Sequence, residues 1–406
     1  MNPYFSELGG TVYERWKAVD FSLEAFPGIA VKALQERPPS RHADLGKLMV
    51  DFLFNDDQPY QSSSGFGQPE LILHDNPRFY IQALFWMDGT TDIHQHGFSG
   101  AFHVMAGSSL HSRYDFEKQR PVTARFRLGD LKLRETALLP TGTTVPIESG
   151  SGCIHSLFHL ETHSVTIVVR THSDPGTDPQ FTYLPPHVAL DPIQNDTLTL
   201  RRKQLLDMLE QTGDPSYPEL VARMIRELDL ERGFFILQNG IGHLRTIGAW
   251  NPVWAAFLKK HGAKARPLLP VLEEIVRRDA IVAMRASVED PDLRFFLALL
   301  LNIPDRKRIL EMVSKRYKGD PLNVIRQWAL ELLGEDEETC WILDARFSES
   351  VDLPEEDRPA VFLAALDHFL CGGKLPAGLC GVPKRDLALL NQVFMDSSWG
   401  VLRKGS

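Results

Sequence analysis

The spacing of apolar residues divides the chain into three regions, and the first of them is helical. Apolar residues recur at helical spacing near the start, which predicts short helices over residues 12–23, 28–34 and 41–53. The polar stretches 55–57 and 62–65 then indicate a loop. We therefore expect residues 1–65 to form an N-terminal helical segment.

Between about residues 70 and 190 the pattern changes to that of short β-strands. Residues 78–86 are aromatic and apolar, and residues 166–169 are a β-branched run. Gly, Pro, Asp and Thr separate the many short segments that lie between them. Closely spaced strands with such turns are typical of a β-sandwich or barrel, which we place at residues 66–195.

From about residue 195 onward helical spacing returns. Leu293, Phe296 and Leu300 fall on one helix face. Asp290-Pro291 and Asp320-Pro321 are typical helix starts, because Asp caps free N–H groups and Pro has none to satisfy. We expect an α+β protein with a separate all-α C-terminal domain over residues 196–406; a solenoid of stacked helical pairs is one form that this domain can take.

The composition of the chain argues against some classes of binding partner. The net charge of −9 and the pI of about 5.9 argue against a nucleic-acid surface. No apolar run reaches the ~18 residues of a membrane span, and the start lacks a signal-peptide pattern. The four cysteines form no C-x-x-C pair and are expected to be reduced. We expect a cytoplasmic protein, with neither nucleic acid nor membrane as a partner.

Histidine is concentrated in the β region, where ten of the 14 histidines lie between His74 and His187. His94 and His96 are two residues apart, and residues i and i+2 of a strand point to the same face. A third imidazole from a neighbouring strand, His155, completes a set of three metal ligands.

The sequence also lacks the motifs of phosphate-binding loops, dinucleotide-binding folds and serine hydrolases.

These residues resemble the two motifs of the cupin superfamily. The first, G-x5-H-x-H-x3,4-E-x6-G, is matched by Gly89, His94, His96, Gly100 in place of the glutamate, and Gly107. The second, G-x5-P-x-G-x2-H-x3-N, is matched by Gly152 and His155, with Gly150 at the proline position and His159 at the asparagine position. The resemblance covers roughly residues 70–190 and implies a cupin-like β-sandwich or barrel.

Without the glutamate, the arrangement is similar to that of three-histidine cupins, and most similar to the cysteine (thiol) dioxygenases. The resemblance implies Fe(II) held by His94, His96 and His155, with Zn, Ni or Mn as alternative metals. The substrate arginine of that family falls near Gln68-Pro69 here, and its crosslinked cysteine falls near Ala101. Cysteine is therefore not the expected substrate.

Three further residues are candidates for catalysis. His103 can be a fourth ligand or a proton shuttle, or else a packed histidine. His159 can hydrogen-bond a ligand histidine and so fix its tautomer. Arg170 can bind a carboxylate with its planar fork, or else end a strand at the surface.

Our leading hypothesis is a mononuclear non-haem Fe(II) oxygenase that uses O2 on a small molecule bound to the iron through a thiolate or an oxygen. One alternative is a non-oxidative metal-dependent isomerase or hydrolase that uses the same histidines. Another is a ligand-binding sensor without turnover. The helical domain is expected to cover the mouth of the barrel or to form a homodimer.

Overall fold

The computed structural model describes residues 3–61, 66–87, 89–191, 196–334, 364, 366–370, 388, 394–395 and 397–403. The chain separates into two compact units, Met1–Val276 and Arg277–Ser406. The first unit contains the whole β region, and with it every candidate site residue.

Four helices precede the strands: α1 (Pro3–Lys17), α2 (Phe26–Glu36), α3 (Pro39–His42) and α4 (Leu45–Phe54). Helix α1 begins and ends earlier than the predicted 12–23, because its buried stripe already starts at Tyr4 and Phe5. The predicted helix over 41–53 is two helices. Asp44 separates them, since its side chain accepts a hydrogen bond from the Lys47 N–H at 2.8 Å and caps α4.

The strands form two sheets that face each other. A five-stranded sheet has the order β1 (Glu70–Asn76), β2 (Phe79–Trp86), β9 (Ser164–Thr171), β4 (Gly100–Ala106) and β7 (Thr144–Ile147). A closed barrel has the order β10 (Thr182–Leu184), β11 (Val188–Leu190), β6 (Phe126–Leu139), β5 (Ser109–Pro121), β8 (Gly150–His159) and β3 (Ile93–His96). The predicted class, α+β with a β-sandwich or barrel and short N-terminal helices, is confirmed.

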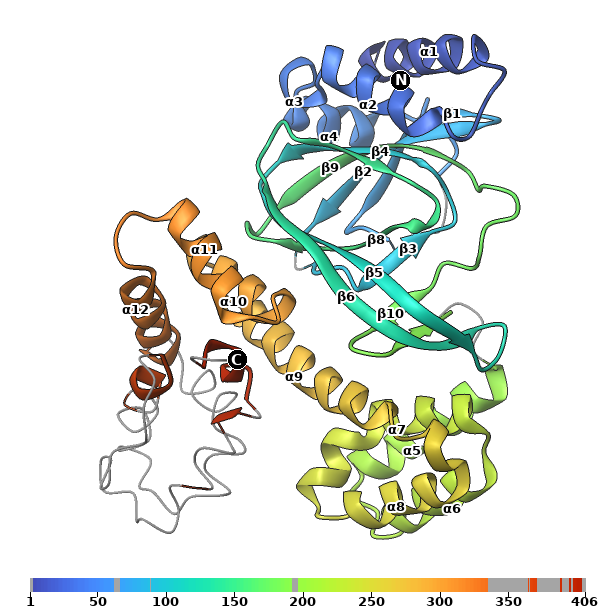
Figure 1. Cartoon of the computed structure of the whole chain (residues 1–406). Coiled ribbons are helices and arrows are strands. Elements are labelled where there is room, and N and C mark those ends of the chain that lie inside the picture. Colours follow the sequence, from blue (N-terminus) through green and yellow to red (C-terminus); the bar gives the residue numbers. More distant parts are fainter. Residues whose placement is uncertain are drawn as a thin grey trace. The chain divides into compact units, whose positions relative to one another are not determined.

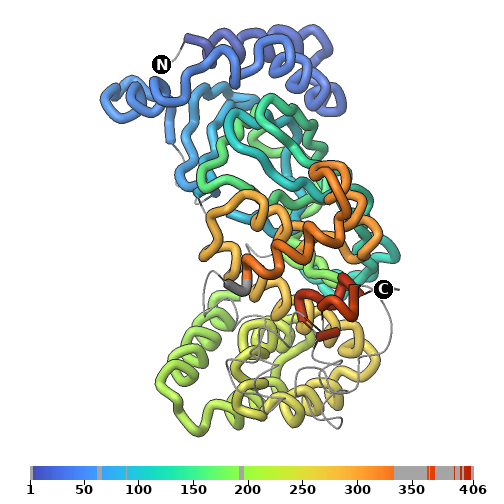
Figure 2. Tube along the Cα trace, turned by 90° about the vertical axis from the view of Figure 1, so that its left-hand side faces the viewer, coloured from blue at the N-terminus to red at the C-terminus, as the bar shows by residue number. Residues whose placement is uncertain are grey.

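Alternate side chains of the five-stranded sheet enter two different cores. One face packs under α1, α2 and α4, where Trp16 is 3% exposed and its ring lies 4.3 Å from that of Phe26 and 6.3 Å from that of Phe79. The other face, with Leu84 and Val168, joins the interior between the two sheets. Figure 1 shows the N-terminal helices on one side of the strands, and Figure 2 shows the same layers after a quarter turn.

The helices that follow the strands pack directly on the barrel. They are α5 (Thr197–Gln211), α6 (Tyr217–Glu227), α7 (Leu230–Thr246), α8 (Trp250–His261), η2 (Gly262–Lys264) and α9 (Leu268–Ser287). Phe126 and Leu128 of β6 and Val188 of β11 share one apolar core with α5 to α9. The helices up to Val276 thus belong to the compact unit of the barrel, and the domain boundary at residues 195 and 196 stays a prediction.

The second unit contains α10 (Pro291–Asn302), α11 (Arg306–Arg316), α12 (Pro321–Gly334) and η5 (Gly400–Leu402). Asp290 accepts hydrogen bonds from the first N–H groups of α10, and Asp320 does so for α12, as predicted. Helix α10 differs from its predicted one-sided pattern, because residues from Leu293 to Asn302 are buried all around it.

The structure also bears on the predictions about membrane spans and cysteines. Within the described residues, no helix is long and apolar enough to cross a membrane. Cys153 is a buried free thiol, and burial raises its pKa to about 11. The other three cysteines lie outside the described residues.

The packing of Trp16 gives the first prediction. Trp16→Ala removes a large ring between two helices and the five-stranded sheet, and we expect a loss of about 3–5 kcal/mol in the free energy of unfolding. Urea denaturation followed by circular dichroism measures it. Tyr60→Ala, at a side chain 79% exposed, is the control and should change stability by less than about 0.5 kcal/mol. Equal effects of the two substitutions would contradict this packing.

Candidate metal centre

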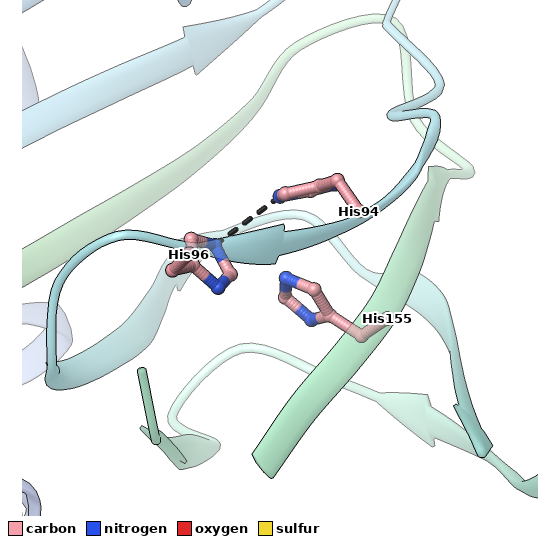
Figure 3. Close-up of side chains that lie close together, drawn as sticks. All are labelled: His94, His96 and His155. Atoms are coloured by element: carbon pink, nitrogen blue, oxygen red, sulfur yellow. Dashed lines mark hydrogen bonds between the residues drawn. The ribbon is translucent and has the colours of Figure 1, made fainter. Parts of the chain in front are cut away.

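Two neighbouring strands of the barrel bring three histidines together. His94 and His96 lie on β3, and His155 lies on β8, directly opposite His94 in the antiparallel pairing. Figure 3 shows the three imidazoles converging from these strands. We call His94, His96 and His155 the histidine cluster. The three imidazoles thus lie together, from two neighbouring strands, and their role as metal ligands stays a prediction.

The cluster is compact and buried. Its ring centroids are 4.7–4.9 Å apart, and one nitrogen from each ring lies within 4.8 Å of the other two. The Nε2 atoms of His94 and His96 are 3.2 Å apart. The exposed fractions of the three residues are 6%, 5% and 2%. Lone pairs this close repel one another unless a proton or a cation lies between them.

Hydrogen bonds from outside the cluster orient two of its rings. The Nδ1–H of His94 donates to the Asp92 carbonyl at 2.7 Å, which leaves the lone pair on Nε2. The Nδ1 atom of His155 lies 2.9 Å from Nε2 of His111 on β5. If Nδ1 of His155 donates there, its Nε2 also presents a lone pair. Nδ1 of His96 is buried and has no hydrogen-bond partner among the described residues.

Burial keeps the cluster neutral. It lowers the pKa of His94, and it lowers the pKa values of His96 and His155 further with the help of neighbouring imidazoles. Burial also lowers the pKa of His111 to about 3. Neutral imidazole is the form that binds metal ions, and three such nitrogens aimed at one point fit a divalent transition metal.

Aromatic side chains surround the cluster. The ring of Phe98 lies 4.6 Å from that of His96, and the ring of Phe102 on β4 lies 6.2 Å from that of His155. Phe66 lies 6.2 Å from His94. Phe102 belongs to the five-stranded sheet, so the cluster faces the interior between the two sheets.

The structure does not bring His103 into the cluster. It lies on β4, on the face that packs under the N-terminal helices, and both ring nitrogens are hydrogen-bonded: Nδ1 to the Thr144 hydroxyl at 2.8 Å and Nε2 to the Ser40 hydroxyl at 2.9 Å. Burial lowers its pKa to about 4. Adjacent residues of a strand point to opposite faces, and His103 follows the inward-facing Phe102. It therefore joins α3 to the sheet.

The structure places His159 on β8, on the same face as His155 but four residues further along. Its Nδ1 lies 2.8 Å from the Ser109 hydroxyl, and its ring stacks on Trp86 at 4.8 Å. His111 is the residue that hydrogen-bonds the ligand candidate His155. Sequence reasoning missed this partner because the register of β5 against β8 decides it, pairing His111 with Leu157 beside His155.

Arg170 lies near the end of β9, is half-buried, and stacks on Phe98, whose ring contacts that of His96. Its guanidinium carbon is 3.3 Å from the ring centroid of Phe98 and 5.0 Å from that of Tyr80. Its Nε and Nη2 groups donate to the carbonyls of Thr171 and His172, both at 3.2 Å. Burial lowers the pKa of Arg170, and its charge helps to lower the pKa of His96. The structure thus brings Arg170 to the cluster, although the Nε side of its fork is already engaged.

Close packing explains why position 100 is a glycine. A Cβ atom on Gly100 would lie 2.0 Å from the Val169 carbonyl oxygen on β9. Any side chain there forces β4 and β9 apart. A carboxylate ligand from this position is excluded by the backbone, and the neutral three-histidine set follows from that pairing.

The chain matches no family model and no characterised protein. Among solved structures, it is similar to the capsular polysaccharide assembling protein CapF of Staphylococcus aureus at 17% identity, with a TM-score of 0.22 over 30% of this chain and 33% of that one. The match thus spans about a third of CapF. Structures of the DMSP lyases RdDddP and RnDddQII give 13% identity and a TM-score of 0.23, over 38% and 76%.

A recombinant oxalate oxidase in complex with glycolate gives 21% identity and a TM-score of 0.20, over 34% of this chain and 66% of that one. Similarities at these scores carry no argument about activity. The chemistry of the site therefore has to be argued from its own residues.

The contact at Gly100 gives the second prediction. We expect Gly100→Ala to lower the free energy of unfolding by about 3 kcal/mol, because the added methyl group meets backbone rather than a movable side chain. Gly97→Ala, with nothing within 4 Å of its Cβ, is the matched control and should change stability little. Denaturation curves of the two variants decide the matter, and a stable Gly100→Ala protein would refute the close approach of β4 and β9.

Proposed function

We propose that the protein is a mononuclear non-haem Fe(II) oxygenase. In this proposal His94, His96 and His155 hold the iron, and a small substrate binds it through a thiolate or an oxygen while O2 is the oxidant. The observation that carries the proposal is the buried set of three imidazoles, in which one nitrogen of each ring lies within 4.8 Å of the other two, and which contains no carboxylate from the described residues.

The donor set favours this chemistry. Three neutral ligands leave the charge of a divalent ion uncompensated, and they leave positions open for an anionic substrate and for O2. Iron held by these residues would supply the means to activate O2 toward a bound substrate. A dioxygenase places both oxygen atoms in its product, so the substrate itself is the reductant and no further electron donor is needed.

The chain's own residues hold the cluster in its binding form. In this proposal Nδ1 of His94 donates to the Asp92 carbonyl and Nδ1 of His155 donates to His111, so that Nε2 of each ring faces the metal. Phe98 and Phe102 exclude water from one side of the site. Without these contacts the imidazoles would be free to rotate.

Arg170 is proposed to favour an anionic substrate at the centre. Its guanidinium stacks on Phe98, which in turn contacts His96. In this partly dry interior, its positive charge stabilises a thiolate or alkoxide more strongly than it would in water. His103 and His159 keep their predicted catalytic roles only as untested expectations, since their hydrogen bonds run to Ser40 and Ser109.

Metal content gives the third prediction. Anaerobically purified protein should contain about one iron per chain by mass spectrometry, and His94→Ala and His155→Ala should each lose it, because two imidazoles remain. His163→Ala, an exposed histidine outside the cluster, is the matched control and should retain the metal. O2 uptake with a screen of thiols and small enolisable acids then tests the oxygenase activity.

Three other outcomes of that experiment have definite meanings. About one zinc or nickel per chain would favour a non-oxidative isomerase or hydrolase at the same histidines. No metal, even after reconstitution with iron, would contradict the metal centre and favour a binding protein without turnover. Metal retained in both cluster variants would place it elsewhere.

The contact between His111 and His155 gives the fourth prediction. His111→Leu removes the partner of Nδ1 of His155, and we expect the metal affinity to fall by about 10–100-fold. Competition with a chromophoric chelator measures this affinity. His111→Gln keeps a polar partner for His155 and should recover part of the lost metal affinity. If the loss came from a packing defect instead, the metal affinity of each variant would fall in step with its melting temperature. An unchanged affinity in His111→Leu would remove His111 from the site.

A further inference from the structure

The inner face of the five-stranded sheet carries polar side chains opposite the histidine cluster. Directly opposed residues in antiparallel strands share a face. Glu70 is paired with Leu84, Gln82 with Val168, and Tyr80 with Arg170. Leu84 and Val168 lie in the core between the two sheets, together with Phe102, which contacts His155. Glu70, Gln82 and Arg170 therefore face the same interior as the cluster.

Two hydrogen-bond acceptors on this face have no donor among the described residues. Gln82 is 2% exposed, and its Oε1 atom accepts no hydrogen bond from them. The Oε2 atom of Glu70 is also buried and has no partner there. An unsatisfied buried acceptor costs about 1–3 kcal/mol, and more if it is charged. Two such acceptors on adjacent strands are a cost that a bound donor would remove.

Charge links these acceptors to the cluster. The Glu70 carboxylate contributes to a raised pKa of Tyr80, after burial, and it opposes the lowering of the Arg170 pKa by burial. Arg170 in turn acts on His96. Its side-chain donors Nε and Nη2 bond to backbone carbonyls and not to Glu70. Glu70 thus lies within the electrostatic reach of Arg170 but accepts no hydrogen bond from its Nε or Nη2 groups.

We propose that Glu70 and Gln82 form a subsite for a protonated amine, at the end of the substrate that does not bind the metal. This inference rests on the proposed function, since it takes the histidine cluster as the place where the other end binds. An ammonium group is compact and carries three donors, so it can satisfy a carboxylate and an amide oxygen together. Its positive charge also makes both hydrogen bonds stronger than those of a hydroxyl group.

The test uses the full chain loaded with Co(II), whose absorption spectrum changes when a thiolate binds. The probes are 2-aminoethanethiol, 2-mercaptoethanol and 3-mercaptopropionate, which share a two-carbon spacer and differ in the end group; the three-carbon homologues repeat the series. We expect the amine probe to bind at least about tenfold more tightly than the other two, a difference of about 1.4 kcal/mol.

Variants assign that preference to the two residues. Glu70→Gln should reduce the preference for the amine to about threefold or less, and Gln82→Leu should weaken binding of the amine probe about tenfold while leaving 2-mercaptoethanol nearly unchanged. Glu117→Gln, at an exposed carboxylate paired with Lys132, is the matched control and should bind all three probes like the parent. Melting temperatures of each variant verify that it is folded.

The outcomes separate the two proposals. Co(II) uptake and thiolate spectra without a preference for the amine, or a preference that survives Glu70→Gln, would overturn the amine subsite and leave the metal centre intact. No Co(II) uptake would contradict the proposed function. Calorimetry with 2-aminoethanethiol and 2-mercaptoethanol on the metal-free chain would then test the subsite. The subsite requires that 2-aminoethanethiol gives heat of binding and that Glu70→Gln abolishes this heat; the absence of such heat would contradict it.

Discussion

The pairing of β3 with β8 is the constraint on which the candidate centre depends. It sets His94 directly opposite His155, while the two-residue period of β3 turns His96 to the same side. A shift of this register by one residue would turn His155 to the other face of its strand. The hydrogen bond to His111 adds a third strand, β5, so that three strands of the barrel position the ligand candidates.

Burial gives these histidines their chemistry. In water an imidazole is half protonated near pH 6.5, but in the interior between two sheets the charged form is disfavoured and the lone pair is retained. The same burial raises the free-energy cost of any polar group that has no hydrogen-bond partner, so a group of this kind is informative. His94 and His155 have partners, whereas Oε1 of Gln82, Oε2 of Glu70 and Nδ1 of His96 have none among the described residues. Such groups are typical of a site that is completed by a ligand.

The rest of the compact unit holds this interior closed. The N-terminal helices cover the outer face of the five-stranded sheet through Trp16 and its neighbours, and α5 to α9 share a core with β6 and β11. Packing also explains the composition of the site. The backbone of β9 lies so close to Gly100 that no glutamate fits, which keeps the cluster free of a carboxylate from that position. The pairing of β4 with β9 is thus the reason why position 100 adds no negative charge to the cluster.

The sequence by itself determined the class of the fold and the three histidines. The two-residue spacing of His94 and His96 needs only the geometry of one strand, and the glycine-bounded pattern around His155 marks another strand. Local signals also located the capped starts of α10 and α12. Only the tertiary structure decided which residues support the cluster. His111, Glu70 and Gln82 have no motif, because their roles come from the register between strands distant in the sequence. His103 illustrates the same limit, since the face of β4 on which it lies was set by packing against α3.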